Sequence, residues 1–273
     1  MYKIMLTVRN RLSITKKCIQ ALYKHSKMKF QLYVYDNCTN YRLDEHFAYF
    51  FKLYEMGYVT QIAFGTKESN FNAFSKAVSS NLFALQHMQD PLKQKYNFLI
   101  ILDNDIIVAP EWDHKIFLVW EDIKKKDLKN VYIVTQHPGG ITNAVVLNWK
   151  PGGIEAVLGK GSGSGLWAVQ TDFFEKIGLL KLSSLVGYNK KHDQFYWRLL
   201  EEKTHGERYV VGLRTILGYH CGRLVGSICN ILSKNSANKD KLIKFENAEK
   251  EIDSMKFAEF YNKISSNKDF HKW

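Results

Sequence analysis

The sequence predicts an α/β protein with a mainly parallel central sheet flanked by helices, followed by a C-terminal helical extension. Over the first 113 residues, short apolar runs typical of strands alternate with longer segments of helical periodicity, as in parallel sheets built from crossover units. The chain has 273 residues and is 45% hydrophobic and 14% aromatic, so it can bury the large core that such a sheet requires. Polar and acidic residues follow several of the expected strands, at the edge where α/β proteins bind ligands.

The first half of the chain supplies strands and helices in turn. A strand Tyr2–Val8 leads into a helix that Ser13 would cap and that ends near His25. The further elements expected up to residue 102 are a strand Phe30–Tyr35, a helix Asp44–Met56, a strand Tyr58–Phe64, a helix Asn72–Met88 and an apolar strand 97–102.

The second half is less regular. Its expected elements are a helix from about His114 to Lys126, a strand Val131–Thr135, a glycine-rich run Gly159–Gly165, a strand Leu166–Gln170, a helix entered at Asp193 and a strand Thr215–Tyr219. Beyond residue 233, apolar residues three or four apart predict one or two amphipathic helices. We expect these helices to pack on the preceding domain, with membrane-surface contact and dimerisation as the alternatives.

The net charge of +12 is unevenly distributed, because residues 1 to 30 contain eight Lys or Arg and no Asp or Glu. We expect a strongly positive, solvated face there. No helix-turn-helix, zinc-finger or RNP-type pattern accompanies the charge, so no nucleic acid is expected as a partner. An anionic membrane surface or a diphosphate substrate remains compatible with it.

Cysteine usage and apolar runs indicate the compartment. The four cysteines, at positions 18, 38, 221 and 229, show neither a CxxC pair nor zinc spacing, which favours a reducing compartment. The first residues hold too short an apolar stretch for a signal peptide, and no segment approaches the roughly 20 apolar residues of a membrane span. We expect a cytoplasmic protein, with peripheral contact at the inner face of the membrane left open and the oligomeric state not predicted.

The motif Asp103-Asn104-Asp105 directly follows an apolar strand. Carboxylates two residues apart on an extended backbone face the same side, so the two would converge at the end of a buried strand. Such oxygen ligands suit Mn²⁺ or Mg²⁺, and Mg²⁺ is commonly held by one or two carboxylates together with substrate phosphates. The alternative is a solvated turn, because Asp and Asn favour turn geometry.

Two further candidates lie in the second half of the chain. Asp193 would enter a helix, where the helix dipole favours an ionised carboxylate; a simple helix cap is the alternative. His220 ends an expected strand, and an isolated histidine in that position is more often structural than a ligand.

Together these pieces resemble family 2 glycosyltransferases of the GT-A fold, whose central sheet is Rossmann-like. The resemblance covers about residues 1 to 225, and the order and spacing of its short motifs are more specific than any one motif. It is carried by Thr7-Val8-Arg9-Asn10-Arg11, Asp36-Asn37, Asp103-Asn104-Asp105 as a DXD motif, the glycine-rich segment before Leu166-Trp167-Ala168-Val169, His192-Asp193 opening a helix with Arg198, and His220.

The resemblance implies a GT-A domain over residues 1–230 and an extension over 231–273. Within the domain, residues 1–113 would bind the nucleotide sugar and residues 114–230 the acceptor. Nucleotide-sugar contacts are implied for Thr7, Val8, Arg9, Asn10, Arg11, Asp36 (to a uracil ring), Asn37, Lys76, Asp103 and Asn104.

The resemblance also implies the metal and the catalytic base. Asp105 matches the direct ligand of Mn²⁺ or Mg²⁺, Asp103 lies closer to the ribose or a metal-bound water, and His220 matches a third metal contact. Asp193 matches the catalytic base. The usual Glu-Asp pair is His192-Asp193 here, so acceptor contacts by His192, and by Trp167, are expectations only.

The implied activity is metal-dependent, inverting transfer of a hexose from a nucleotide diphosphate donor. A UDP-sugar such as UDP-GlcNAc or another UDP-hexose is favoured, and the acceptor would be a hydroxyl of a glycan, a lipid-linked saccharide or a protein. One alternative is a sugar-nucleotide nucleotidyltransferase, although the loop after the first strand lacks the glycines that such an enzyme needs. The other is a sugar-nucleotide-binding protein without transfer activity.

Overall fold

The computed structural model describes residues 1–37, 39, 41–65, 98–136, 143–162, 165–170, 173, 176, 178, 192–207, 209–225 and 239–271. The strands in these residues are β1 Tyr2–Val8, β2 Phe30–Asp36, β3 Gln61–Phe64, β4 Phe98–Asp103, β5 Ile106–Val108, β6 Val131–Gln136, β7 Val145–Val146, β8 Ala156–Gly159, β9 Leu166–Gln170, β10 Tyr209–Leu213 and β11 Gly218–His220. The helices are α1 Leu12–His25, α2 Leu43–Glu55, α4 Trp112–Lys125, α6 His192–Thr204, α7 Gly222–Val225, α8 Lys239–Ser254 and α9 Phe257–Ser265, with 3-10 turns η2 Pro151–Gly153 and η6 Lys268–His271.

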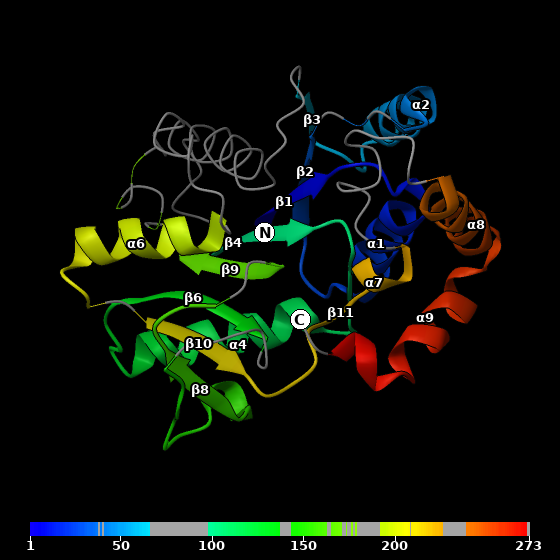
Figure 1. Ribbon diagram of the computed structural model, residues 1–273. Coiled ribbons are helices and arrows are strands. Elements are labelled where there is room, and N and C mark those ends of the chain that lie inside the picture. Colours follow the sequence, from blue (N-terminus) through cyan, green and yellow to red (C-terminus); the bar gives the residue numbers. More distant parts are fainter. Residues whose placement is uncertain are drawn as a thin grey trace.

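One nine-stranded sheet forms the centre of the protein, in the order β3-β2-β1-β4-β9-β6-β10-β8-β7 (Figure 1). Parallel pairs join β3 to β2, β2 to β1, β1 to β4 and β6 to β10. Strand β9 runs antiparallel to β4 and β6, and β8 runs antiparallel to β10 and β7. Seven strands therefore share one direction and only β8 and β9 oppose it, which confirms the predicted α/β class with a mainly parallel sheet.

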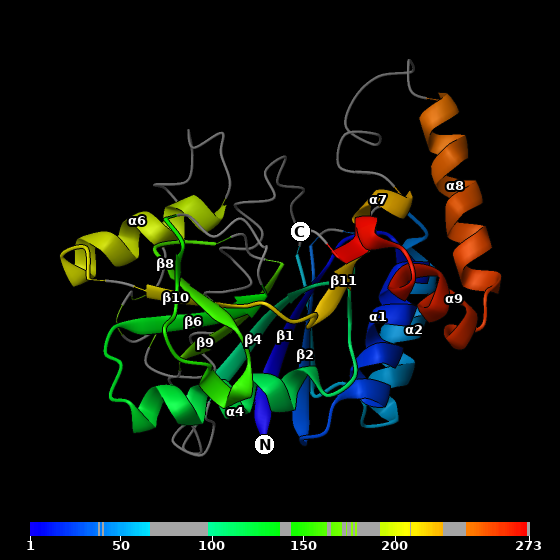
Figure 2. The same ribbon diagram turned by 90° about the horizontal axis from the view of Figure 1, so that it is seen from below.

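The helices cover the sheet unevenly. Figures 1 and 2 show α1, α2, α8 and α9 gathered beside the β1 to β3 half, with α6 at the other end of the molecule. Strands β5 and β11 form a separate two-stranded antiparallel sheet, and β5 packs against α1. This small sheet brings His220 next to the turn that follows β4.

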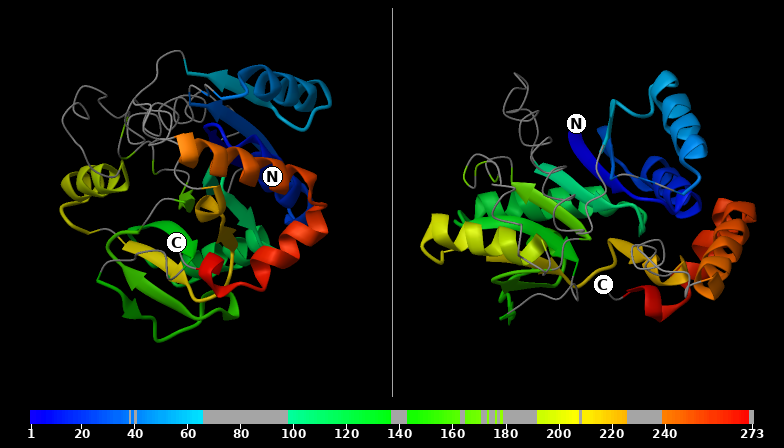
Figure 3. Two further views of the ribbon diagram at one scale, coloured as in Figure 1. Left: turned by 45° about the vertical axis from the view of Figure 1, so that its right-hand side comes forward. Right: turned by 45° about the horizontal axis from the view of Figure 1, so that its top comes forward.

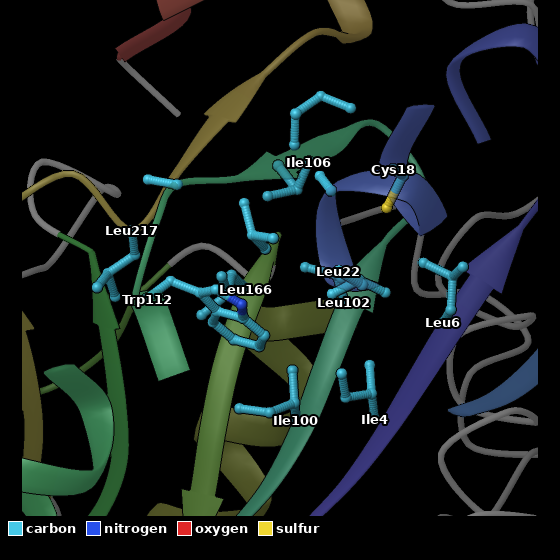
Figure 4. Packing of buried hydrophobic residues seen from close by; sticks show 14 of the residues in the cluster. Ile4, Leu6, Cys18, Leu22, Ile100, Leu102, Ile106, Trp112, Leu166 and Leu217 are labelled. Carbon is cyan, nitrogen blue, oxygen red and sulfur yellow. The ribbon is translucent and has the colours of Figure 1, made fainter. Parts of the chain in front are cut away.

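The core lies between α1, the central strands and β5. Figure 4 shows Cys18 and Leu22 of α1 beside Leu6 of β1 and Leu102 of β4, and all four side chains are fully buried. Each such aliphatic side chain stabilises the fold by roughly 1.5 to 3 kcal/mol through burial alone. This packing fixes the ends of β1 and β4, from which the candidate site is built.

Most predicted elements are present within a few residues of their expected bounds, and β1 and β9 have the bounds that we predicted. Strand β3 starts at Gln61, three residues later than expected. Strands β5, β7, β8 and β10 were not predicted. The predicted helix Asn72–Met88 lies outside the described residues.

The prediction that Ser13 caps the first helix is wrong. Helix α1 begins at Leu12, and its N-cap residue Arg11 is in the left-handed conformation and supplies no side-chain cap. Instead, the backbone N–H and hydroxyl of Ser13 donate hydrogen bonds of 3.1 and 2.6 Å to the Glu249 carboxylate of α8. The cap of α1 therefore comes from Glu249 of α8, which lies 236 residues after Ser13 in the sequence.

The two C-terminal helices pack against the rest of the protein, as expected. Helix α8 lies beside α1 (Figure 3), where Lys16 pairs with Asp253 at 2.8 Å. Tyr261 of α9 makes an edge contact with Tyr219 of β11. The position of the boundary at residue 231 itself stays a prediction.

The basic residues among positions 1 to 30 do not all lie on the expected solvated face. Lys3 and Lys17 are buried. Three of the remaining cations pair with acids elsewhere: Arg11 with Asp105, Lys16 with Asp253, and Lys27 with Glu111. In the part of the chain that the structure describes, no helix is both long and apolar enough to cross a membrane.

Candidate functional site at the carboxyl ends of β1, β2 and β4

The turn after β4 is buried rather than solvated. Strand β4 ends at Asp103, and Asn104 and Asp105 form a turn in which they are 7% and 8% exposed. The Asn104 N–H donates to the Thr7 carbonyl at 3.2 Å, and its side-chain amide donates to Thr15 Oγ1 at 2.8 Å. Because the backbone turns here, the alternation of an extended strand does not relate Asp105 to Asp103.

Asp105 is the centre of a charged cluster. Its Oδ2 accepts a hydrogen bond of 2.5 Å from Arg11 Nη1 and lies 3.4 Å from His220 Nε2. Its backbone carbonyl accepts a hydrogen bond of 2.8 Å from the Cys221 N–H, which ties the turn to the end of β11. Three segments that are distant in the sequence thus meet at one carboxylate oxygen.

The electrostatics of His220 follow from this contact. The hydrogen bond with Asp105 raises the pKa of His220 above its ordinary value, burial acts in the opposite direction, and the charge of Asp103 adds to the increase. Asp103 is therefore close enough to act on His220 through its charge. The predicted metal ligands accordingly share one electrostatic environment.

Gly222 lies directly against the two candidate metal-ligand atoms, Asp105 Oδ2 and His220 Nε2. A Cβ at this position would lie 2.5 Å from Asp105 Oδ2 and 3.0 Å from His220 Nε2. A carboxylate oxygen suits Mn²⁺ or Mg²⁺, and an imidazole nitrogen binds divalent transition metals, of which Mn²⁺ is one. No group of three or more His, Cys, Asp and Glu suited to a metal occurs among the described residues.

The loops after β1 and β2 lock together. The Asn10 N–H donates to Thr39 Oγ1 at 3.0 Å, and the Asn10 side-chain oxygen accepts from the Tyr41 N–H at 3.0 Å. The Asp36 carboxylate accepts hydrogen bonds from the Thr39 N–H and hydroxyl at 2.8 and 2.7 Å. Thr39 thus joins two residues that we predicted as nucleotide contacts, and no local pattern identified it.

Asp36 is buried with little countercharge. Burial raises the pKa of Asp36, and the hydrogen bonds from Thr39 and the positive charge of Arg9 oppose the increase. His46 of α2 is fully buried and its Nδ1 lies 3.7 Å from Asp36 Oδ2, which is too far for a hydrogen bond. Burial lowers the pKa of His46 to about 4.

Other predicted contacts lie at the same edge of the sheet or inside it. Thr7 pairs with both Tyr35 and Asp103 across the parallel strands, and the Val8 carbonyl accepts from the Asn37 N–H at 2.7 Å. Trp167 is fully buried in β9, and its indole N–H donates to Ser162 Oγ at 3.0 Å. Trp167 has no exposed surface in this structure, and its contact with an acceptor stays a prediction.

Three predicted site residues cannot be placed. Lys76 lies outside the described residues, as do the side chains of His192 and Asp193. The backbone of these last two residues forms the first turn of α6, as expected. Arg198 of the same helix is exposed and pairs with Glu202 at 3.3 Å.

Comparisons with known proteins support the fold and leave the family open. No protein-family model and no curated protein matches the sequence. Among solved structures, S. aureus TarS is 11% identical with a TM-score of 0.51, covering 90% of this chain and 43% of TarS. TarS 1-349 in complex with UDP is 10% identical with a TM-score of 0.50, covering 90% of this chain and 70% of that one. The mannosyltransferase PcManGT from Pyrobaculum calidifontis, in complex with GDP-Man and Mn²⁺, is 9% identical with a TM-score of 0.51. The match covers 92% of this chain and 69% of PcManGT.

These likenesses show the fold, which is that of GT-A glycosyltransferases. The chain spans less than half of the full TarS chain.

Proposed function

We propose that this protein is a glycosyltransferase that uses a nucleotide diphosphate sugar, with a divalent metal bound at Asp105 and His220. One observation carries the proposal: Arg11, Asp105 and His220 converge next to Gly222, whose lack of a side chain leaves the Asp105 and His220 atoms uncovered. This convergence lies at the carboxyl end of a parallel sheet, where α/β proteins bind nucleotides.

The residues around the site suit a diphosphate leaving group. Bound there, Mn²⁺ or Mg²⁺ would supply Lewis-acid stabilisation of the charge that develops on the departing phosphate. Arg11 presents a guanidinium group, which binds phosphate through several N–H donors in a fixed geometry. We assign Asp103 to the ribose or to a metal-bound water, consistent with its position at the end of β4.

The donor base would be bound between the β1 and β2 loops. Asn10, Thr39 and Asp36 form a rigid hydrogen-bonded unit there. A uracil N–H donated to the Asp36 carboxylate would give that buried group a further donor. The UDP complex of TarS 1-349, which shares the fold, is consistent with a UDP-sugar as donor.

Asp193 is our candidate for the general base, because its backbone opens α6 and a helix N-terminus favours an ionised carboxylate. A carboxylate that takes the proton from an acceptor hydroxyl contributes about 10²- to 10⁴-fold in rate. A single direct attack would invert the anomeric centre. The acceptor is a hydroxyl of a glycan, a lipid-linked saccharide or a protein.

The test is a screen of UDP-, GDP- and dTDP-sugars for nucleotide release with Mn²⁺, Mg²⁺ or EDTA. We expect one UDP-sugar to be turned over only with metal. Asp105→Asn should lose turnover and Mn²⁺ binding, whereas Asp193→Asn should retain UDP binding and lose turnover. Asp127→Asn is the matched control, because Asp127 lies in a turn with its side chain 82% exposed.

Other outcomes would replace the proposal. Release of pyrophosphate from a nucleoside triphosphate and a sugar phosphate would identify a nucleotidyltransferase. Tight binding of a sugar nucleotide with no turnover at any metal concentration would indicate a binding protein without transfer activity. If Asp105→Asn and Asp127→Asn behave alike, the site assignment is wrong.

A further inference from the structure

Arg11 and the proposed metal need the same atom of Asp105. Arg11 Nη1 donates to Asp105 Oδ2 at 2.5 Å, and His220 Nε2 lies 3.4 Å from that same oxygen. A metal shared by Asp105 and His220 would therefore take the oxygen that Arg11 holds. Two cations at one carboxylate oxygen repel each other strongly where water is scarce. Water is scarce here, because the Arg11 and Asp105 side chains are only 13% and 11% exposed.

The backbone of Arg11 is fixed near this oxygen. Both Asn10 and Arg11 have positive φ, at 51° and 53°, a region that an arginine seldom occupies. The Arg11 carbonyl accepts hydrogen bonds from the Thr15 N–H at 3.0 Å and from the Thr15 hydroxyl at 2.9 Å. The start of α1 therefore aims the guanidinium at Asp105, and only the side chain has to move if Arg11 is to leave.

Arg11 also has a donor to spare. Its Nε is buried and makes no hydrogen bond to the described residues. A diphosphate bound beside Asp105 would offer oxygens to that N–H and to the Nη groups. A nucleotide diphosphate thus supplies an alternative anionic partner for Arg11 at the moment when it brings the remaining metal ligands.

We infer that Arg11 occupies the metal position of Asp105 in the free protein and exchanges to the donor diphosphate when the metal binds. Arg11 is then a positioning residue that makes metal binding depend on the nucleotide. By linkage, UDP raises the affinity for metal by the same factor as metal raises the affinity for UDP. The inference rests on the proposed function, because it takes the metal site at Asp105 and the diphosphate donor from it.

The experiment measures Mn²⁺ binding to the full-length protein by electron paramagnetic resonance, with and without UDP, so it requires no turnover. We expect Arg11→Gln to bind Mn²⁺ about tenfold more tightly than the wild type without UDP, equivalent to about 1.4 kcal/mol. UDP should raise the Mn²⁺ affinity of the wild type more than that of Arg11→Gln. Arg11→Lys, which keeps the charge, should lie between the two.

Two controls separate the exchange from general effects. Arg42 is a matched residue, because it also precedes a helix in the left-handed conformation and pairs with a nearby acid, Glu45, at the surface. Arg42→Gln should bind Mn²⁺ like the wild type. Adding Asp105→Asn to Arg11→Gln should abolish the gain, and thermal unfolding of each variant verifies that it is folded.

The outcomes distinguish this inference from the proposed function. If Asp105→Asn weakens Mn²⁺ binding but Arg11→Gln binds no more tightly than the wild type, the exchange is overturned and the metal site stands. If Asp105→Asn leaves Mn²⁺ binding unchanged in both backgrounds, the metal site and the exchange both fall. Equal gains in Arg11→Gln and Arg42→Gln would also overturn the exchange, because they would reflect net charge alone.

Discussion

At the scale of single residues, Gly222 shows how little room the site allows. A Cβ at this position would meet the side-chain ends of Asp105 and His220 rather than backbone atoms. The fold can therefore tolerate a larger residue by displacing those two side chains. Function should be more sensitive than stability at this position.

We expect Gly222→Ala to bind Mn²⁺ at least about tenfold more weakly in the presence of UDP, a loss of about 1.4 kcal/mol. The free energy of unfolding should stay within about 1 kcal/mol of the wild type, because Ala favours helix by up to that amount and Gly222 begins α7. Calorimetric titration and urea unfolding measure the two quantities. Unchanged Mn²⁺ affinity in a folded variant would contradict the placement of the metal.

The buried His46 predicts a loss of stability in acid. Its pKa is about 4 in the folded protein and about 6.5 in the unfolded chain, because burial disfavours the charged ring. Between these values the unfolded chain binds a proton that the folded protein does not. The free energy of unfolding should thus fall by about 3 kcal/mol as pH drops through this window.

Urea unfolding at pH 7 and at pH 4.5 tests this expectation. His46→Leu should lose less stability than the wild type between the two pH values, because it has no group to titrate there. His205→Asn is the control, since His205 is exposed and lies in a left-handed turn where Asn is well tolerated. Equal losses in the wild type and His46→Leu would show that His46 is not the cause.

The sequence predicted the charged atoms of the site better than their supports. The resemblance implied metal contacts for Asp105 and His220 and a nucleotide contact for Arg11, and the structure brings these three side chains together. Thr39 and Gly222 were not identified, because their roles arise from contacts across the chain that leave no periodic signal. As the alternative to a metal site at Asn104 and Asp105 we considered only a solvated turn, because the burial of a polar turn cannot be predicted from its own residues.

At the scale of elements, the start of α1 depends on α8. Helix α1 has no acidic residue in its first turn and no side-chain cap of its own. Glu249 supplies both a negative charge and two acceptor atoms there. Burial raises the pKa of Glu249, and the hydrogen bonds from Ser13 oppose the increase.

We expect Ser13→Ala to lower the free energy of unfolding by about 1 kcal/mol and Glu249→Gln by about 1 to 3 kcal/mol. The double variant should lose less than the sum, because the two residues share one interaction. Asp253→Asn is the comparison on the same helix, and its partly exposed pair with Lys16 should contribute less than about 1 kcal/mol. Additive losses in urea unfolding would contradict the cap.

Apart from β5, the strands that the sequence failed to predict lie in the second half of the central sheet. Strand β7 has only two residues, and both of its valines are exposed, so its pattern carries no burial signal. Strand β10 contains Val210, Val211 and Leu213, all fully buried. That apolar run is a usable signal for a strand, although it is only a few residues long.

At the scale of the whole molecule, the end of the sheet opposite the site is held by Asp113. This buried carboxylate accepts hydrogen bonds from the Tyr2 hydroxyl at 3.2 Å and from three backbone N–H groups. Those groups belong to Lys27, Met28 and His114, at 3.0, 2.8 and 2.9 Å. The start of β1, the α1–β2 connection and α4 are thereby joined, near the N-terminus in Figure 2.

Asp113→Asn should separate stability from function. The amide nitrogen of the introduced asparagine cannot accept hydrogen bonds, so some of the buried donors to Asp113 lose their acceptor. This loss should lower the free energy of unfolding by about 2 to 4 kcal/mol. Mn²⁺ and UDP affinities at 25 °C should equal those of the wild type, because the site lies at the other edge of the sheet. A loss of affinity in the folded variant would show that the two ends are coupled.

The overall class followed from the alternation of strands and helices in the first 113 residues, where parallel pairs such as β1 with β2 are built from consecutive segments. The antiparallel β9 between β4 and β6 was identified as a strand, but its direction could not be predicted. Direction is decided by the path of the connections, and no periodicity within Leu166–Gln170 encodes it.

The cap on α1 also concerns time during synthesis. The ribosome adds about 5 to 20 residues per second. Ser13 and Glu249 are 236 residues apart, so α1 waits roughly 10 to 50 s for its capping carboxylate. Throughout that interval, α1, which follows Arg11, lacks the acceptor that Glu249 of α8 provides for the Ser13 N–H. The first turn of α1 therefore gains its hydrogen-bond acceptor only after Glu249 has been synthesised.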